Sequence, residues 1–332
     1  MKNEELRMKK LLKKTLKLIL PIVLGGFILY WVYRDFDFTK AGDVLLHGTN
    51  WWWMLFSLVF GVFAQVFRGW RWRQTLEPLD AFPKKSDCVN AIFISYAASL
   101  VVPRIGEVSR CGVLAKYDNV SFAKSLGTVV TERLVDTLTI LLITGITVLL
   151  QLPIFVTFLQ QTGTKIPSLV HLLTSVWFYI ILFCFIGVAI LLYYLRKTLF
   201  FYERVKGFVL NIWEGIMSLK GVRNIPLFIF YTLAIWACYF LHFYFTFYCF
   251  AFTAHLGILA ALVMFVGGTF AVIVPTPNGA GPWHFAIISM MMLYGVNVTD
   301  AGIFALIVHG IQTFLVVLLG IYGFAVLSFT NR

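Results

Sequence analysis

Long runs of apolar residues, separated by short polar segments, dominate the pattern of this chain. A helix needs about 17–25 predominantly apolar residues to cross the hydrocarbon core of a bilayer. The pattern therefore predicts an all-α polytopic membrane protein. Six runs of roughly the required length predict about six transmembrane helices: Leu18–Tyr33, Trp51–Phe67, Leu134–Leu152, Leu169–Leu195, Leu227–Phe252 and Ile303–Phe329.

Two further apolar stretches are interrupted by proline, glycine and ionisable residues. They are Val101–Arg110, which reads VVPRIGEVSR, and Ile273–His284, which reads IVPTPNGAGPWH. At membrane depth, irregular backbone and charge are tolerated only where protein or a water-filled cavity surrounds them. Two such breaks, one in each half of the chain, are typical of a transporter site near the bilayer midplane. We therefore expect two re-entrant hairpins, near residues 87–116 and 256–294.

Lysine and arginine concentrate in alternate loops, and this asymmetry predicts the orientation in the membrane. With a cytoplasmic N-terminus, eighteen positive residues of the tail and loops face inward and three face outward. This distribution requires the first hairpin to enter and leave on the cytoplasmic side, and the second on the outer side. The hairpins are then oppositely oriented and form an inverted pseudo-repeat. The predicted layout is a basic cytoplasmic tail over residues 1–17 and a single transmembrane domain over residues 18–329, with the C-terminus also cytoplasmic.

The composition excludes several classes of protein. Of the 332 residues, 60% are hydrophobic and 13% are charged, whereas soluble domains average about 45–50% apolar and about 25% charged residues. The net charge of +12 does not indicate nucleic-acid binding, because the positive residues lie in short loops between spans. The five cysteines show no CxxC spacing, and the sequence contains no P-loop, GxGxxG or HExxH motif. We therefore predict no nucleic-acid partner, no metal, no cofactor and no catalytic residues.

The first break carries the strongest candidates for a binding site. Pro103 stops the incoming helix and Gly106 permits a turn, which places Arg104 at the tip of the hairpin. Glu107 and Arg110 are three residues apart and share a face of the outgoing helix. Because a guanidinium donates two parallel hydrogen bonds, Arg104 and Arg110 are candidates for binding a lipid phosphate, with Glu107 as the orienting counter-charge. An internal Arg–Glu ion pair is the alternative.

A second charged cluster stands at the start of a long apolar run. Glu132, Arg133 and Asp136 are close together in sequence, and charges at this depth should point into the interior of the bundle. They are candidates for a headgroup or proton pathway, or for structural bridging to the first hairpin. Upstream, Arg68–Arg73 reads RGWRWR, which is typical of an interfacial anchor. Arg68 is the exception, because it is also a candidate for the interior and for contact with a lipid phosphate.

The second break contains Asn278, Gly279 and Gly281 in a turn rich in proline and glycine. Free backbone N–H groups in such a turn can form a nest for an anion. The steric demands of a tight turn explain the same residues equally well. His284 lies one turn into the outgoing helix, where its charge could change near neutral pH. His309 and Gln312, three residues apart in the last span, could share the same cavity, and the alternative is that they are hydrogen-bonded core residues.

Four blocks of residues, in this order, resemble a known family: Arg68–Arg73, Asn90–Arg110, Glu132–Asp136 and Pro275–Gly281. On these blocks, residues 15–328 resemble the membrane-domain family of lysyl-phosphatidylglycerol synthase/flippases, as a stand-alone member. The resemblance implies a multi-pass protein of a bacterial or archaeal cytoplasmic membrane that moves an anionic or aminoacylated lipid between leaflets. It also implies a lipid cavity lined by Arg104, Glu107, Arg110, Glu132, Arg133 and Asp136.

This chain departs from the family's pattern in the second hairpin. Asn278 stands where the family usually has a glycine, and His284 stands near the position of a glutamate. The headgroup of the substrate and any charge coupling are therefore left open. Because no aminoacyl-transferase domain follows residue 332, this chain is not expected to synthesise an aminoacylated lipid by itself.

The leading hypothesis is a lipid flippase. Arg104 and Arg110 would hold a lipid phosphate near the midplane while the two hairpins gate opposite leaflets. The lipid would be an anionic or aminoacylated phospholipid, or a polyprenyl phosphate. The alternatives are a membrane-embedded transferase acting on lipid or polyprenyl-linked sugar, and a scaffold for a lipid-modifying enzyme. The expected partner is a membrane phospholipid, and the sequence leaves open a homo-oligomer or a partner enzyme that synthesises lipid.

Overall fold

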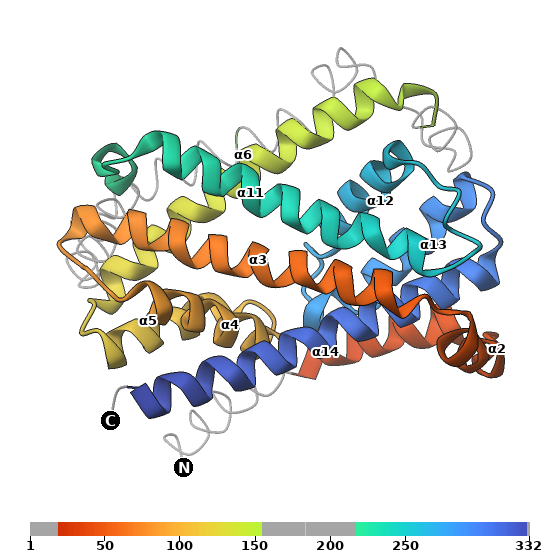
Figure 1. Cartoon of the computed structure of the whole chain (residues 1–332), viewed down its shortest axis with the longest axis horizontal. Coiled ribbons are helices and arrows are strands. Elements are labelled where there is room, and N and C mark those ends of the chain that lie inside the picture. Colours follow the sequence, from red (N-terminus) through yellow and green to blue (C-terminus); the bar gives the residue numbers. More distant parts are fainter. Residues whose placement is uncertain (1–18, 155–182, 184–216, 331–332) are drawn as a thin grey trace.

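The computed structural model describes residues 19–154, 183 and 217–330 of the chain (Figure 1). Every regular element within these residues is a helix. Four of the described helices are long and apolar enough to cross a membrane, namely Trp51–Leu79, Phe122–Leu150, Ile225–Cys249 and Val298–Thr330. A fifth candidate is a pair of helices, Ile19–Tyr33 and Phe38–Gly48, bent by 97°. The chain is therefore an all-α polytopic membrane protein.

Polar residues at the boundaries explain where several of these helices begin. The Asn50 side chain accepts hydrogen bonds from the N–H groups of Trp52 and Trp53, which caps the helix that follows. Asn224 caps a later helix in the same way, with a proline in its first turn. After Ile19–Tyr33 the elements are α2 (Phe38–Asp43), η1 (Val44–Gly48), α3 (Trp51–Leu76), η2 (Glu77–Leu79), α4 (Lys85–Val101), α5 (Ile105–Tyr117), α6 (Phe122–Leu150), η3 (Ser218–Gly221), α11 (Ile225–Tyr244), η4 (Phe245–Cys249), α12 (Ile258–Ala271), η5 (Pro277–Gly279), α13 (Pro282–Leu293) and α14 (Val298–Thr330).

The expected spans and the observed helices agree in place but differ in length. The expected span Leu169–Leu195 and the tail over residues 1–17 lie outside the described residues. Helix α3 continues nine residues beyond the expected end at Phe67, and α6 begins at Phe122 rather than at Leu134. Polar residues extend both helices because their hydrogen bonds are internal to the backbone and their side chains find partners in the bundle. The charged clusters therefore lie inside α3 and α6.

Helices α4 and α5 form the first of the two predicted hairpins, and we call this pair of helices the first hairpin. Its two ends meet at the base, where the N–H of Lys84 donates to Oδ1 of Asp118 over 3.3 Å. Close packing of the two helices requires a glycine, since a Cβ at Gly106 would lie 2.0 Å from the carbonyl oxygen of Ser95. The segment thus turns back on itself, as the pattern of proline and glycine predicted.

The second hairpin is formed by α12 and α13, joined by residues 272–281. Small residues again permit close contact, because a Cβ at Gly268 would lie 2.8 Å from the Trp283 indole nitrogen. The turn itself has positive φ at Gly279 (71°) and Gly281 (92°), a region that glycine enters without steric cost. A Cβ at Gly281 would also meet Ile28, so the turn packs directly against the helix Ile19–Tyr33.

The two hairpins point toward each other from opposite ends of the bundle (Figure 1). A guanidinium nitrogen of Arg104, at the tip of the first hairpin, donates to the carbonyl oxygen of Ile273, in the turn of the second, over 3.2 Å. Each hairpin has its own hydrophobic core. One core contains Trp72 and Leu114 against the first hairpin, and the other contains Phe304 and many residues of the second. The space between the two tips is where the candidate site lies.

Candidate functional site

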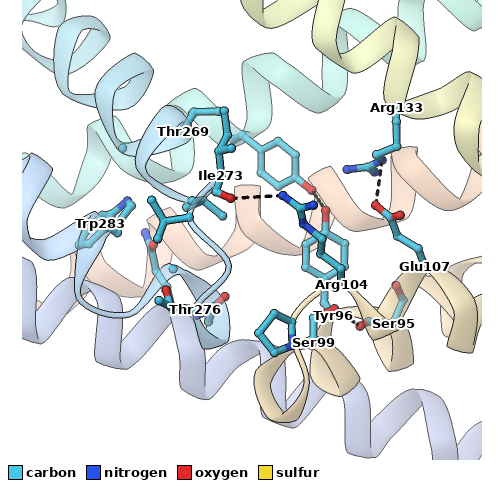
Figure 2. Close-up of a pocket in the computed structure, with 18 of the residues that line it drawn as sticks. Ser95, Tyr96, Ser99, Arg104, Glu107, Arg133, Thr269, Ile273, Thr276 and Trp283 are labelled. Atoms are coloured by element: carbon cyan, nitrogen blue, oxygen red, sulfur yellow. Dashed lines mark hydrogen bonds and ion pairs between the residues drawn. The ribbon is translucent and has the colours of Figure 1, made fainter. Parts of the chain in front are cut away.

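A cavity of about 760 Å³ lies between the two hairpin tips (Figure 2). Its walls come from α3, α4, α5, α6, α11, α12, α13 and α14, so that it is enclosed by both halves of the chain. Its volume is in the range of sites that hold small molecules. Among the residues singled out from the sequence, seven line it: Arg68, Arg104, Glu107, Arg110, Arg133, Asn278 and Gly279.

Arg104 is the exposed arginine of the cavity lining. Within the described residues its one hydrogen bond is the one to the Ile273 carbonyl across the gap (Figure 2). None of the described carboxylates forms an ion pair with it. Its backbone has φ 65° and ψ −1°, the left-handed conformation that costs a non-glycine residue about 1–2 kcal/mol. The turn therefore holds Arg104 at the tip in a strained conformation that presents its guanidinium to the cavity.

Behind the cavity wall, Asp136 gathers three arginines. Its carboxylate oxygens lie 2.9 Å from Nη1 of Arg68 and 2.6 Å from Nη2 of Arg71, and Arg133 approaches to 3.4 Å. The side chains of Arg71 and Asp136 are 0% and 9% exposed. Buried charges persist only when they are paired and hydrogen-bonded, so this cluster joins α3 rigidly to α6.

Glu132 completes the same network one helical turn earlier. Its carboxylate is fully buried, 2.5 Å from Nη2 of Arg110 and 3.6 Å from Nη2 of Arg71. The Arg110 guanidinium also lies over the Trp72 ring, with its carbon 4.5 Å from the ring centroid. Because α5 supplies Arg110 and α6 supplies Glu132, the first hairpin is held against the long helices by charge as well as by packing. Of the two roles left open for Glu132 by the sequence, the ion pair with Arg110 is the structural bridge to this hairpin.

The formal charge of the site is positive. Glu107 is half-buried and lies 3.5 Å from Nε of Arg133 (Figure 2). The carboxylates of Glu107, Glu132 and Asp136 therefore each face at least one guanidinium. Together the lining residues and the network behind them contain five arginines and three carboxylates, a formal charge of +2. A low-dielectric site with this excess favours an anionic group.

The hydrogen bonds in the turn of the second hairpin distinguish between the two explanations of its glycines, a nest for an anion and a tight turn. The N–H of Gly279 donates to the carbonyl of Thr276, that of Ala280 to the carbonyl of Pro277, and that of Gly281 to Nδ1 of His284. These donors are used within the turn, so the steric explanation of the glycines is the correct one. Gly281 and His284 lie outside the residues that line the cavity.

His284 and Asn278 instead hold the turn together. His284 is buried, with its ring 4.6 Å from that of His309 between centroids. His309 in turn contacts the carbonyl oxygen of Asn278 through Nε2, over 3.0 Å, and the Asn278 amide donates to the hydroxyl of Thr313 over 2.7 Å. Asn278 has φ 52°, a conformation that asparagine tolerates better than most residues. These contacts fasten the second hairpin to α14.

Two of the predicted cavity residues, Glu132 and Asp136, also lie behind the lining rather than in it. The reason is that their oxygens are enclosed by guanidinium groups. The expectation of an interfacial anchor at Arg68–Arg73 is wrong for Arg71 and Trp72, which are fully buried. The spacing of three between Arg68 and Arg71 could have signalled this, because it puts both on one face of a helix.

Polar residues of the cavity that sequence reasoning did not single out include Tyr96 and Tyr239, whose hydroxyl groups lie 2.8 Å apart. The Arg68 guanidinium carbon lies 5.6 Å from the centroid of the Tyr239 ring. No group of three or more histidine, cysteine, aspartate or glutamate residues in the described part of the chain could hold a metal ion.

The family model described as "Lysylphosphatidylglycerol synthase TM region" matches residues 18–320. The chain belongs to this family. The match includes both hairpins and all the charged residues of the site, and it supports a membrane protein of lipid modification or translocation. Neither a curated protein nor a solved structure matches the chain. The family resemblance inferred from the four sequence blocks is thus confirmed.

Proposed function

We propose that this chain moves a lipid with an anionic phosphate between the two leaflets of the membrane, and that the phosphate binds Arg104 in the cavity. One observation carries the proposal. An arginine without a carboxylate partner among the described residues stands in a cavity between two opposed hairpins. Membership of the lysylphosphatidylglycerol synthase family supports a substrate that is a phospholipid or resembles one.

The chemistry of Arg104 suits a phosphate. A guanidinium has five N–H donors in a planar fork that matches two phosphate oxygens. Only one of these donors is used within the described structure, by the Ile273 carbonyl. The neighbouring Arg71 and Arg110 form ion pairs with Asp136 and Glu132, and they add positive potential around the ligand.

The arrangement of the hairpins suits exchange between leaflets. Because the Arg104–Ile273 hydrogen bond joins the two tips, a phosphate that takes the Arg104 donors would release the Ile273 carbonyl. Opposed hairpins around a site near the midplane provide a route to each leaflet in turn. The acyl chains would stay in the bilayer while only the headgroup crosses through the cavity.

We propose transport rather than catalysis. A general base must lie within hydrogen-bond reach of the proton that it takes from the substrate. The oxygens of Glu132 and Asp136 face arginines behind the cavity lining, and Glu107 faces Arg133. These pairings support a binding role for the site.

The test is reconstitution of the full chain in liposomes with fluorescent phosphatidylglycerol or polyprenyl phosphate, with dithionite quenching of the outer leaflet. We expect native protein to accelerate exchange, and Arg104→Ala to reduce the initial rate about tenfold or more, since a charge-assisted hydrogen bond contributes about 1.5–3 kcal/mol. Arg104→Lys should retain part of the rate.

Arg34→Ala is the matched control, because Arg34 is an exposed arginine that pairs with Asp35 away from the cavity. It should exchange lipid at the native rate. Equal rates for native protein and Arg104→Ala would refute the role of the hairpin tip. A lack of exchange with every anionic lipid would contradict autonomous transport and favour a membrane-embedded transferase or a scaffold.

A further inference from the structure

Three uncharged polar side chains on the cavity wall have a buried atom without a hydrogen-bond partner in the described structure; Arg68, Arg110 and Arg133 of the same wall have such nitrogen atoms as well. The three uncharged side chains are Trp236 through Nε1, Thr276 through Oγ1 and Gln312 through Nε2. They come from α11, from the turn of the second hairpin and from α14. Thr276 is only 4% exposed. Three separate elements therefore each contribute to one cavity wall a residue with an unsatisfied, buried polar atom.

Unpartnered buried donors require an explanation, because nearly all buried polar groups in folded proteins are hydrogen-bonded. The indole nitrogen and the amide nitrogen can only donate, and the threonine hydroxyl can donate or accept. Their natural complement is a group rich in oxygen acceptors, and because none of the three side chains is charged, that group need not carry a charge. Hydroxyl groups of a polyol fit this description, and a hydroxyl can also donate to Thr276.

The position of Thr276 relates these donors to the proposed phosphate site. Arg104 contacts the carbonyl of Ile273, and Thr276 follows three residues later in the same turn (Figure 2). Three residues span at most about 11 Å of chain. A polyol joined to a phosphate at Arg104 can bridge this distance.

The charges of the cavity disfavour an aminoacylated headgroup. Glu107 is the one carboxylate among the described lining residues, and it already faces Arg133 at 3.5 Å. An ammonium group would therefore enter a site with a formal excess of positive charge and without an unpaired carboxylate. A neutral headgroup meets no such penalty.

We propose that Trp236, Thr276 and Gln312 form a specificity site for the uncharged, hydroxyl-bearing headgroup of an acidic phospholipid, such as a glycerol or inositol group. This inference rests on the proposed function, in which Arg104 holds the phosphate of the same lipid. It assigns selectivity between acidic lipids to the second hairpin and α14, and affinity for their phosphate to the first hairpin.

Binding to the purified full chain in detergent tests the inference without requiring transport. Phosphatidylglycerol, phosphatidylinositol, phosphatidylmethanol and lysyl-phosphatidylglycerol would be titrated separately and bound lipid counted by native mass spectrometry. Phosphatidylmethanol keeps the phosphodiester charge and lacks the hydroxyl groups. We expect the two polyol lipids to bind about tenfold tighter than phosphatidylmethanol, as one or two net hydrogen bonds would give. Lysyl-phosphatidylglycerol should bind more weakly than phosphatidylglycerol.

Trp236→Phe, Thr276→Val and Gln312→Leu each remove one unsatisfied group and nearly keep the shape. Each should lower affinity for phosphatidylglycerol severalfold and leave phosphatidylmethanol unchanged. Thr269→Val is the matched control, because Thr269 lines the same cavity and its hydroxyl donates to the Phe265 carbonyl over 2.7 Å. The ratio of its affinity for phosphatidylglycerol to its affinity for phosphatidylmethanol should equal that of the native chain.

Thermal unfolding without added lipid separates recognition from a structural role. Removal of a buried group that has no partner should leave the unfolding temperature unchanged or raise it. A fall would indicate that the group stabilises the fold, against the inference. Equal binding of phosphatidylglycerol and phosphatidylmethanol by native protein would also overturn it, while Arg104-dependent exchange would still support transport. If native protein bound none of the four lipids, that result would instead contradict the proposed function.

Discussion

Arg71 and Arg104 carry the same guanidinium group, and the fold gives them different surroundings. Arg71 is fully buried between Asp136 and Glu132, whereas Arg104 is exposed at the hairpin tip with the Ile273 carbonyl as its partner. A buried guanidinium is stable only beside carboxylates, and one with free donors is available to an anion. At the scale of single residues, the pattern of pairing separates structural arginines from the candidate ligand-binding one.

Substitution of Asp136 tests the structural half of this distinction. Asp136→Asn leaves Arg68 and Arg71 buried with less counter-charge, and breaking a buried ion pair typically costs about 3–5 kcal/mol. We expect a marked fall in the unfolding temperature in detergent. Asp35→Asn removes an exposed ion pair with Arg34 and should lower the free energy of unfolding by about 1 kcal/mol or less. Similar unfolding temperatures for the two variants would show that the buried network does not stabilise the fold.

The half-length helices of the hairpins are the elements that build the site. Helix α5 has 13 residues and packs on α4 at Gly106, where the N–H of the glycine also donates to the Ser99 hydroxyl over 3.2 Å. This contact lies two residues after Arg104. The separation of α4 from α5 therefore sets the position of Arg104, the side chain proposed to bind the phosphate.

Two glycines of α5 allow a matched test. Gly106→Ala puts a Cβ 2.0 Å from the Ser95 carbonyl oxygen, so the helices must separate. Overpacking of this kind typically lowers the free energy of unfolding by about 1–3 kcal/mol. The rate of lipid exchange should fall as well. A Cβ at Gly112 would meet no atom within 4 Å, and Gly112→Ala should stabilise the helix by up to about 1 kcal/mol. Normal exchange and stability in Gly106→Ala would exclude this packing contact as a determinant of the site.

At the scale of the whole molecule, two hairpins with separate cores approach each other from opposite ends. The described spans surround them, with α3 packed along α11 and α14 packed along α4. The bases of the two hairpins therefore lie at opposite ends of the bundle (Figure 1), and that these ends face opposite sides of the membrane is a prediction from the sequence. Which side is cytoplasmic is a prediction from the charges of the loops.

Accessibility of introduced cysteines tests this topology. With the native cysteines replaced, Lys85→Cys and Asn119→Cys at the base of the first hairpin should react with a membrane-impermeant maleimide only from the cytoplasmic side. His255→Cys and Val298→Cys, beside the base of the second, should react only from outside. All four positions are exposed. Labelling of Lys85→Cys and Asn119→Cys from opposite sides would mean that the first hairpin spans the membrane.

Much of the fold could be predicted from the order of residues along the chain. Apolar runs identify spans, and the breaks at Pro103 and Pro275 identify the two hairpins, because both signals depend on neighbours within one or two helical turns. The family could be recognised for the same reason, since its motifs are contiguous blocks. The lengths of α3 and α6 could not, because polar residues continue a helix only when distant partners satisfy them.

The composition of the site depended on the tertiary structure. Arg71 lies 65 residues from Asp136 in sequence, and their contact exists only because α3 packs against α6. The same holds for the enclosure of Glu132, for the burial of His284 and for the unsatisfied donors at Trp236 and Gln312. Local sequence determines which residues carry charge and where helices break. The packing of helices decides which charges neutralise one another and which face a cavity, because electrostatic pairing acts through space and not along the chain.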